Sequence, residues 1–311
     1  METILVTGGA GYLGSVCVPE LLTQGYKITV IDNFRYKQNS LNTVCHHKNF
    51  EIIKGDVRLK STMLPLIKKV DYILPLAALV GAPLCNQDPL TATAVNKEAI
   101  LMMLDNISSQ QRIIMPTTNS AYGSGDADNF CDETSPLNPI SHYAIEKVEV
   151  EKALMEHPNA ISYRLATVFG MSPRMRLDLL VNDFTYRAVY DGFLVLFEGN
   201  FRRNYIHIRD VARAFSHAIT HFDLLKGEIF NVGLSNANLS KLELCAKIKA
   251  NLPNFHYIEA SYGKDPDQRN YVISNKKIEN TGYKPQYSIN DGIIELIKGY
   301  TMLRNSIYSN V

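Results

Sequence analysis

The chain has 311 residues and is nearly neutral, with 32 Lys and Arg against 31 Asp and Glu. This length can bury a large α/β core with a smaller lobe, and a net charge of +1 without a basic stripe argues against nucleic acid as a partner. Five scattered cysteines without a C-x-x-C spacing argue against disulfides or a metal site, and the absence of a signal pattern or a long apolar stretch predicts a cytoplasmic protein with no membrane partner.

Short apolar runs alternate with amphipathic stretches through the first half of the chain. The predicted strands are residues 3–7, 27–31, 51–53, 71–74, 112–116 and 161–165. The predicted helices between them are residues 13–24, 62–68, 90–107 and 142–157. Apolar strands joined by helices predict an α/β fold with a doubly wound parallel Rossmann sheet, which binds its ligand beyond the carboxyl ends of the strands.

The pattern becomes irregular after about Phe169. Helices are predicted over residues 178–190, 209–221 and 239–250, and one more strand over residues 227–233. We therefore predict a smaller, interrupted carboxyl-terminal substrate lobe. Residues 1–166 and about 202–224 are assigned to an NAD-binding domain, and about 167–201 and 225–311 to the lobe.

The first strand runs directly into a glycine-rich turn and a helix. Gly8, Gly11 and Gly14 have the G-x-x-G-x-x-G spacing, and Gly9 completes a G-x-G-x-x-G pattern. Glycines allow the tight turn and the close approach of a pyrophosphate, and the start of the helix offers unpaired N–H groups to the phosphates. The pattern predicts a dinucleotide site.

Two aspartates follow the next strands. Asp32 ends the second strand, at the distance expected for the residue that binds an adenosine ribose, and it favours NAD over NADP. Arg35 keeps NADP open as the alternative cofactor, because a nearby Arg could accommodate a 2′-phosphate. Asp56, followed by Val57, closes the third strand, and either an adenine contact or a helix cap would explain it.

A Y-x-x-x-K pattern places Tyr143 and Lys147 on one face of a predicted helix. The pKa of Tyr143 must fall by about three for the phenol to act as a base near neutrality, which corresponds to roughly 4 kcal/mol. A neighbouring ammonium and a positive nicotinamide ring both favour the phenolate. Thr118, at the end of an earlier strand, could share the substrate oxygen with Tyr143.

Further segments add to these motifs: Leu76-Ala77-Ala78 after the fourth strand, residues 133–139 before the Tyr helix, residues 203–214 with the sequence R-N-Y-I-H-I-R-D-V-A-R-A, and Asn231-Val232-Gly233. Along almost its entire length the chain resembles the extended short-chain dehydrogenase/reductase family, in particular the nucleotide-sugar epimerases and dehydratases. The resemblance implies Thr118, Tyr143 and Lys147 as catalytic residues.

The resemblance also implies the ligand contacts. Cofactor contacts are expected from Gly8, Gly11, Tyr12, Leu13, Gly14, Asp32, Asn33, Asp56, Val57, Leu76, Ala77, Ala78, Asn96, Tyr143 and Lys147. Contacts to a nucleotide-diphosphate sugar are expected from Val80, Asn119, Ser120, Thr167, Arg203 and Arg269. Asn96 could equally be an ordinary helix residue, and Arg269 a solvated one. Related enzymes pair the helices 90–107 and 142–157 between subunits, so a homodimer or a larger even assembly is expected unless these faces only cover the sheet.

Departures from the family pattern narrow the reaction. Dehydratases of the family carry an Asp-Glu pair after the active-site Thr, where this chain has Asn119 and Ser120, so dehydration is not expected. Thr167 replaces a usual Asn, and Glu146 replaces a small residue before Lys147. The chain is similar to enzymes that make 4-keto nucleotide sugars, including GDP-heptose 4-dehydrogenases. NAD-dependent oxidation at C4 is therefore predicted, with a 4-epimerase as the alternative and a non-catalytic dinucleotide-binding regulator as a distant one.

Overall fold

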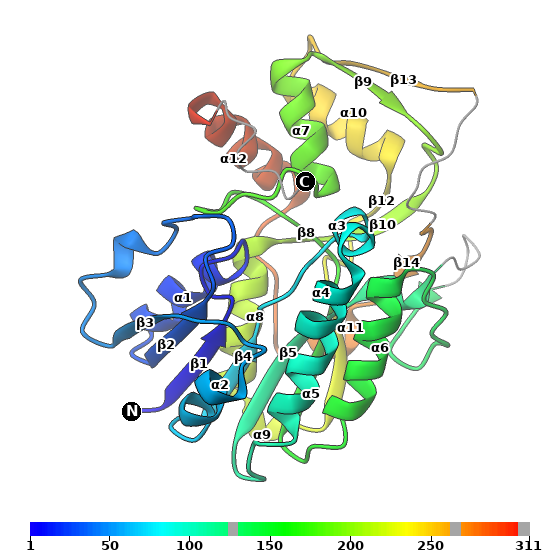
Figure 1. Ribbon diagram of the computed structural model, residues 1–311. Helices are drawn as coiled ribbons and strands as arrows, with labels where there is room; N and C mark the ends of the chain where they lie inside the picture. Colours follow the sequence, from blue (N-terminus) through cyan, green and yellow to red (C-terminus); the bar gives the residue numbers. More distant parts are fainter. Residues whose placement is uncertain (124–129, 262–268, 304–311) are drawn as a thin grey trace.

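A seven-stranded parallel sheet forms the centre of the computed structural model, which describes residues 1–123, 130–261 and 269–303 (Figure 1). The strand order is β11-β7-β5-β4-β1-β2-β3. The strands are β1 (Thr3–Thr7), β2 (Lys27–Asp32), β3 (Phe50–Lys54), β4 (Tyr72–Pro75), β5 (Arg112–Thr118), β7 (Ala160–Leu165) and β11 (Glu228–Val232). The predicted doubly wound Rossmann sheet is confirmed.

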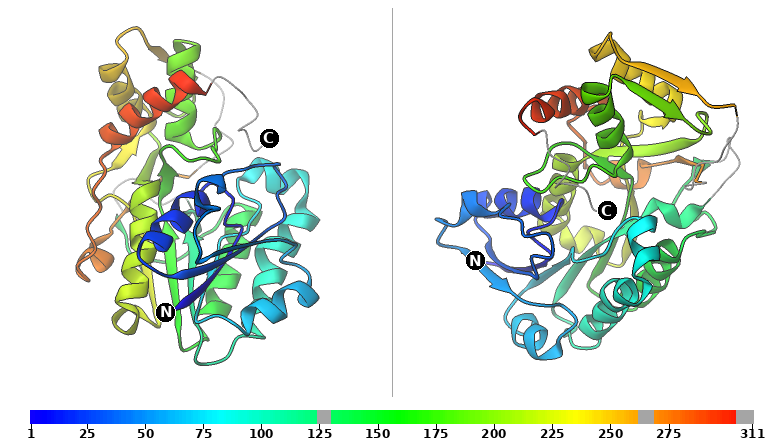
Figure 2. Two further views of the ribbon diagram at one scale, coloured as in Figure 1. Left: turned by 90° about the vertical axis from the view of Figure 1, so that its left-hand side faces the viewer. Right: turned by 45° about the horizontal axis from the view of Figure 1, so that its top comes forward.

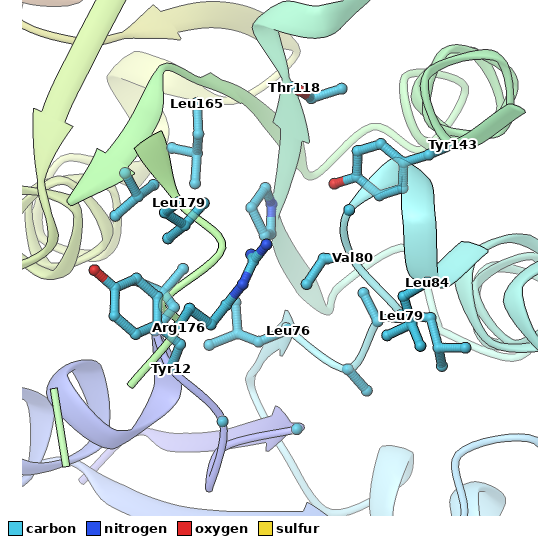
Figure 3. Close-up of a pocket in the computed structure, with 18 of the residues that line it drawn as sticks. Tyr12, Leu76, Leu79, Val80, Leu84, Thr118, Tyr143, Leu165, Arg176 and Leu179 are labelled. Atoms are coloured by element: carbon cyan, nitrogen blue, oxygen red, sulfur yellow. The ribbon is translucent and has the colours of Figure 1, made fainter. Parts of the chain in front are cut away.

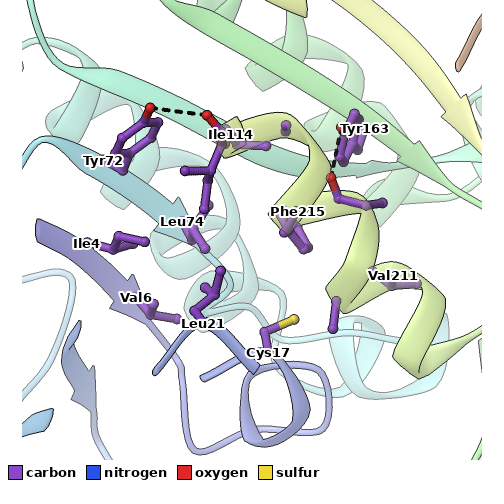
Figure 4. Packing of buried hydrophobic residues seen from close by; sticks show 14 of the residues in the cluster. Ile4, Val6, Cys17, Leu21, Tyr72, Leu74, Ile114, Tyr163, Val211 and Phe215 are labelled. Carbon is purple, nitrogen blue, oxygen red and sulfur yellow. Dashed lines mark hydrogen bonds between the residues drawn. The ribbon is translucent and has the colours of Figure 1, made fainter. Parts of the chain in front are cut away.

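Helices cover both faces of the sheet because the buried strands present apolar side chains alternately to each side. Ile4 and Val6 of β1 pack with α1 (Gly14–Thr23) and α8 (Ile208–Thr220), as Figure 4 shows around Leu21 and Phe215. Leu5, between them in the sequence, packs on the opposite side with α2 (Lys60–Ile67), α5 (Ala99–Leu104) and α6 (His142–Leu154).

The helix predicted over residues 90–107 is continuous but not uniform. It consists of α4 (Pro89–Thr93), a π-helical turn η2 (Ala94–Glu98) and α5, and it follows the short helix α3 (Ala82–Gln87), which the sequence did not predict. A π turn inside a helix re-aims one side chain and is frequent at functional sites. Here it contains Asn96.

The lobe lies at the carboxyl ends of the sheet strands (Figures 1 and 2). Its helices are α7 (Leu180–Tyr190), α10 (Lys241–Asn251) and α12 (Ile289–Met302). Its small sheets are β12 (Asn238–Ser240) with β10 (Arg202–His207) and β8 (Thr167–Phe169), and β13 (His256–Glu259) with β9 (Phe193–Leu196). Two short strands, β6 (Phe130–Cys131) and β14 (Val272–Ile273), form another pair.

The predicted division of the chain is wrong at two places. Strand β11, assigned to the lobe, is the edge strand of the central sheet, and α11 (Lys276–Glu279) packs against it. Strand β10, assigned to the NAD-binding domain, pairs with β8 and β12 outside that sheet. The chain therefore crosses between the two parts more often than the sequence pattern indicated. The predicted end of the lobe, residues 304–311, lies outside the described residues.

Candidate active site

A cavity of about 870 Å³ lies between the carboxyl edge of the sheet and the lobe (Figure 3). The structure brings most of the predicted site residues into its wall. The sheet side contributes Gly8, Gly11, Tyr12, Leu13, Gly14, Asp32, Asn33, Asp56, Val57, Leu76, Ala77, Ala78, Val80, Thr118, Ser120, Tyr143 and Lys147. The later segments contribute Thr167, Arg203 and Arg269. The predicted residues Asn96 and Asn119 do not line it.

The glycine loop is shaped by the close approach of backbone to backbone. Gly8 has a φ of +65°, and a Cβ there would lie 2.6 Å from the Cα of Ala77. A Cβ on Gly14 would lie 2.5 Å from the Cα of Gly9. Gly11 differs, because its Cβ would meet only the carbonyl oxygen of Gly8, at 3.1 Å, and the residue lines the cavity. The start of α1 has no side-chain cap, so its N–H groups and the space at Gly11 fit a pyrophosphate.

Asp32 is held in place by the backbone around it. Its carboxylate accepts hydrogen bonds from the amides of Ala10, at 3.0 Å, and Phe34, at 2.8 Å. Burial raises the pKa of Asp32, and these hydrogen bonds oppose that rise. A fixed, cavity-lining carboxylate can accept hydrogen bonds from ribose hydroxyls. Arg35 also lines the cavity, so the structure keeps a cation beside this end of the site.

Asp56 does not cap a helix. Helix α2 starts at Lys60 after an N-cap at Leu59, and the Asp56 carboxylate pairs with Arg58 at 2.5 Å. The hydrogen bonds from Arg58 lower the pKa of Asp56, which keeps the carboxylate charged at the cavity wall beside Val57. Its position is compatible with the predicted adenine contact.

Asn96 lies behind the wall of the cavity. Its Oδ1 accepts a hydrogen bond from the Leu79 amide and its Nδ2 donates to the Leu79 carbonyl oxygen, both at 2.9 Å. The side chain is fully buried. The prediction of a direct cofactor contact is therefore not met in this geometry, because both ends of the amide hold the loop after β4. The π turn directs Asn96 toward that loop.

Thr118, Tyr143 and Lys147 line the same part of the cavity. Ser141 is the N-cap of helix α6, and its hydroxyl accepts a hydrogen bond from the backbone amide of Ala144. This cap fixes the first turn, which carries Tyr143. The Lys147 ammonium lies 5.9 Å from the centre of the Tyr143 ring. The i, i+4 spacing thus places both groups on the cavity face, as expected.

The protein's own groups raise the pKa of Tyr143, whereas a base near neutrality needs a lowered one, and they lower the pKa of Lys147. Burial raises the pKa of Tyr143 to about 12, with Arg176 and Arg269 opposing the rise. Burial lowers the pKa of Lys147 to about 8, with Glu146 opposing the fall. Desolvation outweighs these opposing charges, since burial penalises both charged forms. Further positive charge is needed to make Tyr143 a base near neutrality.

A buried ion pair behind Thr118 and Lys147 was missed by the sequence reasoning. Glu151 pairs with Arg164 at 2.6 Å and accepts hydrogen bonds from the hydroxyls of Thr117, at 2.9 Å, and Ser162, at 2.7 Å. Glu151 lies four residues after Lys147, and Thr117 precedes Thr118. The ion pair therefore joins α6 to β7, and the hydrogen bond from Thr117 joins α6 to the end of β5. The helical spacing from Tyr143 and Lys147 was the available signal.

The end of the cavity that contains Ser120 is rich in cations. Arg269 donates a hydrogen bond to the hydroxyl of Ser120, which also accepts one from the Thr118 hydroxyl at 2.9 Å. Asn119 is buried away from the cavity, and within the described part of the chain nothing hydrogen-bonds its side chain. The substrate contact predicted for Asn119 is not seen, because η3 (Asn119–Tyr122) turns it inward.

Three further cations in the lining were not predicted: Arg174, Arg176 and Lys241. The two arginines belong to residues 170–179, which pass from β8 to α7 over the start of α1, and we call this stretch the bridging segment (Figure 1). Its Ser172 hydroxyl lies 2.8 Å from that of Ser15, and the Tyr12 hydroxyl donates to the Gly170 carbonyl oxygen at 2.8 Å. Sequence patterns give no signal for such a crossing between distant segments.

The comparisons with known proteins agree with this architecture. The model of the NAD dependent epimerase/dehydratase family matches residues 4–233. A low-salt glycan biosynthesis protein, Agl12, of Haloferax volcanii is 26% identical, over 96% of this chain and 98% of that protein. The CDP-paratose 2-epimerase of Salmonella typhi is 26% identical, over 93% and 96%. The solved dTDP-glucose 4,6-dehydratase of Bacillus anthracis, in complex with NAD, has a TM-score of 0.82 at 22% identity and 99% coverage of both chains.

The chain belongs to the NAD dependent epimerase/dehydratase family. The predictions of an NAD-dependent enzyme and of a nucleotide-sugar epimerase/dehydratase type of protein are confirmed at this level. The relatives include epimerases and dehydratases, so family membership leaves the exact reaction open.

The described residues contain no group of three or more His, Cys, Asp or Glu arranged to hold a metal ion. No helix in residues 1–123, 130–261 and 269–303 has the length and apolar character needed to cross a membrane.

Proposed function

We propose that this protein oxidises the C4 hydroxyl of a nucleotide-linked sugar with NAD, giving a 4-keto sugar without loss of water. The observation that carries this proposal is the convergence of Thr118, Tyr143 and Lys147 in one cavity, with a pyrophosphate-compatible glycine loop on one side and several cations on the other. Three groups of this kind suit the removal of a hydroxyl proton as hydride leaves the same carbon.

The residues present fit NAD. Asp32 would hold the adenosine ribose, the glycine loop and the start of α1 the pyrophosphate, and Lys147 the nicotinamide ribose. When bound, NAD supplies the hydride acceptor and a positive ring near Tyr143. Tyr143 would accept the proton of the sugar hydroxyl, and Thr118 would orient that hydroxyl. Arg203 and Arg269 would bind the diphosphate of the substrate.

The geometry speaks against dehydration. Of the two residues that stand where dehydratases carry carboxyl groups, Ser120 lines the cavity and Asn119 is buried behind it. Among the described residues, the acids in the lining are Asp32, Asp56 and Asp178, and Asp178 is paired with Arg176 at 2.5 Å. Elimination of water requires a carboxylic acid or an equivalent proton donor near the leaving hydroxyl.

A 4-epimerase is the second candidate, and the bridging segment favours it. This segment contacts the glycine loop through Ser172 and Tyr12. A covered cofactor is suited to transient oxidation, in which the hydride returns to the other face of the ketone. A net dehydrogenase must instead release or reoxidise NADH in every cycle.

We also propose a cytoplasmic homodimer, or a larger even assembly, formed through α4 and α6. Leu90 at the start of α4 is 85% exposed, and Ile145 on the outer side of α6 is 42% exposed. The ion pair between Lys97 of the π turn η2, which continues α4, and Glu149 of α6 lies beside them. Light scattering on the Ile145→Glu variant would test the proposal: smaller particles than the parent are expected, and an unchanged mass contradicts this surface.

The experiment that tests the proposed reaction supplies the purified protein and NAD with a panel of GDP-, UDP- and dTDP-sugars, including a GDP-heptose. NADH absorbance and the mass of the sugar product are followed together. A product two hydrogens lighter with stoichiometric NADH supports net oxidation. A sugar of altered configuration and unchanged mass supports the epimerase, and loss of water overturns both. The Tyr143→Phe variant is the control for catalysis by this site.

A further inference from the structure

Arg176 stands in the middle of the cavity although it comes from the bridging segment and not from the sheet. Figure 3 shows its side chain extending from beside Tyr12 into the space that the Tyr143 hydroxyl also faces. The side chain is 14% exposed. A guanidinium placed there remains charged at any pH at which the protein is folded.

The position of Arg176 is fixed at both ends of the residue. Its Nη2 lies 2.5 Å and its Nε 3.2 Å from the two carboxylate oxygens of Asp178. Its carbonyl oxygen accepts a hydrogen bond from the side-chain Nδ2 of Asn182 at 2.9 Å, and the same Nδ2 donates to the Tyr12 hydroxyl at 3.1 Å. The ion pair is therefore anchored to the glycine loop and to α7, which limits the freedom of the guanidinium.

The electrostatic surroundings of Tyr143 agree with this placement. Around the phenol, Arg176 and Arg269 oppose the rise of its pKa, while Cys85 on α3 adds to it. Arg176 is the larger of the two opposing influences. Lys147, from the same helix as Tyr143, is itself desolvated, and burial lowers its pKa to about 8. An ammonium that loses its proton near that pH is a weaker source of positive charge than a guanidinium.

Both members of the ion pair act on Tyr12: Arg176 lowers its pKa and Asp178 raises it. At Tyr143, Arg176 opposes the rise of the pKa. The carboxylate of Asp178 orients the guanidinium through its two contacts with Nη2 and Nε.

We propose that Arg176 is a further residue of the catalytic centre: carried in by the bridging segment, it acts together with Lys147 to stabilise the phenolate of Tyr143. The inference rests on the proposed role of Tyr143 as the base. It adds that the base becomes fully active only when the lobe side places its cation in the cavity. Assembly of the base then depends on the contacts of the bridging segment with Tyr12 and Ser15.

The test uses the full-length protein saturated with NAD and measures the ionisation of Tyr143 directly, without sugar. The chain has 17 tyrosines, so the phenolate signal near 295 nm is taken as the difference between each protein and the same protein carrying Tyr143→Phe. Arg176→Gln removes the cation and Arg176→Lys retains a charge. Arg174→Gln is the matched control, because it removes an arginine of the same segment whose guanidinium lies 4.2 Å from the centre of the Tyr36 ring.

We expect Arg176→Gln to raise the midpoint of the Tyr143 titration by about one pH unit, and Arg176→Lys to raise it less. Arg174→Gln should leave the midpoint in place. With an active substrate, the pH profile of kcat for Arg176→Gln should move by the same amount, with kcat falling about tenfold below the midpoint.

Three results would overturn the inference. The first is an equal midpoint in the parent and Arg176→Gln, even if KM for a sugar rises, because Arg176 would then only bind substrate or structure. The second is an equal rise in Arg176→Gln and Arg174→Gln. The third is a Tyr143 that stays protonated up to pH 10 in the parent. The titration needs no sugar, so an error in the proposed substrate or reaction leaves its outcome unaffected.

Discussion

The two walls of the cavity are built by different means. The sheet wall presents backbone and small residues at strand ends, where Gly8 touches Ala77 and Asp32 is held by two amides. The lobe wall presents long cationic side chains, among them Arg176, Arg203 and Lys241. The first wall fits a ligand through shape, and the second through charge.

Because the two walls differ in this way, substitutions in them should have different effects. Backbone geometry at the glycine loop allows one arrangement, so changes there should affect the cofactor and the fold together. Charges on the lobe act over several ångströms and tolerate small movements, so changes there should alter affinity and proton transfer while the fold persists. Five variants test this comparison, from the largest expected effect to the smallest.

The largest effect is expected for Tyr143→Phe at the junction of the two walls. Loss of the phenolic oxygen should lower kcat about a thousandfold, because Tyr143 is the proposed acceptor of the hydroxyl proton. NADH formation and product mass are the measurements. Binding of NAD, followed by fluorescence, should remain within about twofold of the parent. Activity within tenfold of the parent would remove Tyr143 from the role of base.

Gly8→Ala tests the sheet wall. Its Cβ would lie 2.6 Å from the Ala77 Cα at a φ of +65°, so the backbone must move. We expect the free energy of unfolding to fall by roughly 1–3 kcal/mol and NAD binding to weaken. Chemical denaturation and fluorescence titration measure the two effects.

Gly11→Ala is the matched variant in the same loop. Its Cβ would meet only the Gly8 carbonyl oxygen, at 3.1 Å, and would project toward the cavity. It should weaken NAD binding with little change in the free energy of unfolding. Equal destabilisation by the two variants would contradict a separation of folding and binding roles within the loop.

Lys147→Met separates stability from catalysis. Burial lowers the pKa of Lys147 from 10.5 to about 8. Below about pH 8 the folded protein therefore contains a buried ammonium, which lowers its free energy of unfolding. The unfolded chain binds more protons between these two values, so the free energy of unfolding of the parent should rise with pH across that window. The variant should lose this rise and gain on the order of 2 kcal/mol at pH 7, while hydride transfer falls. Denaturation at pH 7 and pH 9.5 checks it, and a less stable variant at pH 7 would contradict the burial argument.

Arg203→Ala tests the lobe wall. Arg203 lines the cavity, whereas its neighbour Arg202 is turned outward and pairs with Glu243 at 3.0 Å. Removing Arg203 should raise KM for the nucleotide sugar about tenfold, equivalent to roughly 1.4 kcal/mol, with a smaller change in kcat. Steady-state kinetics of Arg203→Ala and the control Arg202→Ala measure this. A larger effect of the Arg202 variant would place the diphosphate elsewhere.

The sheet and its loop were accessible to pattern reasoning because each signal is local. The apolar run of Ile4, Leu5 and Val6, the spacing of Gly8, Gly11 and Gly14, and the four-residue step from Tyr143 to Lys147 each depend on the geometry of one strand, one turn or one helix. The structure places these residues as those patterns indicated.

The residues whose positions were predicted wrongly depend on irregular turns and on long-range strand pairing. Asn96 was expected in the cavity, but a π turn directs it to Leu79, and Asn119 follows Thr118 but is turned inward by η3. Strand β11 was assigned to the lobe because its pairing with β7 connects segments more than sixty residues apart. Local periodicity carries no information about such pairings.

The sequence by itself therefore determined the parallel Rossmann sheet, the dinucleotide loop and the Tyr-Lys-Thr set, because backbone geometry repeats over a few residues. Only the tertiary structure decided that Arg174 and Arg176 enter the cavity, that Glu151 joins α6 to β5, and that burial raises the pKa of Tyr143 while it lowers that of Lys147. Desolvation and long-range charge depend on which distant segments exclude water from the same space, and that is settled only when the lobe packs on the sheet.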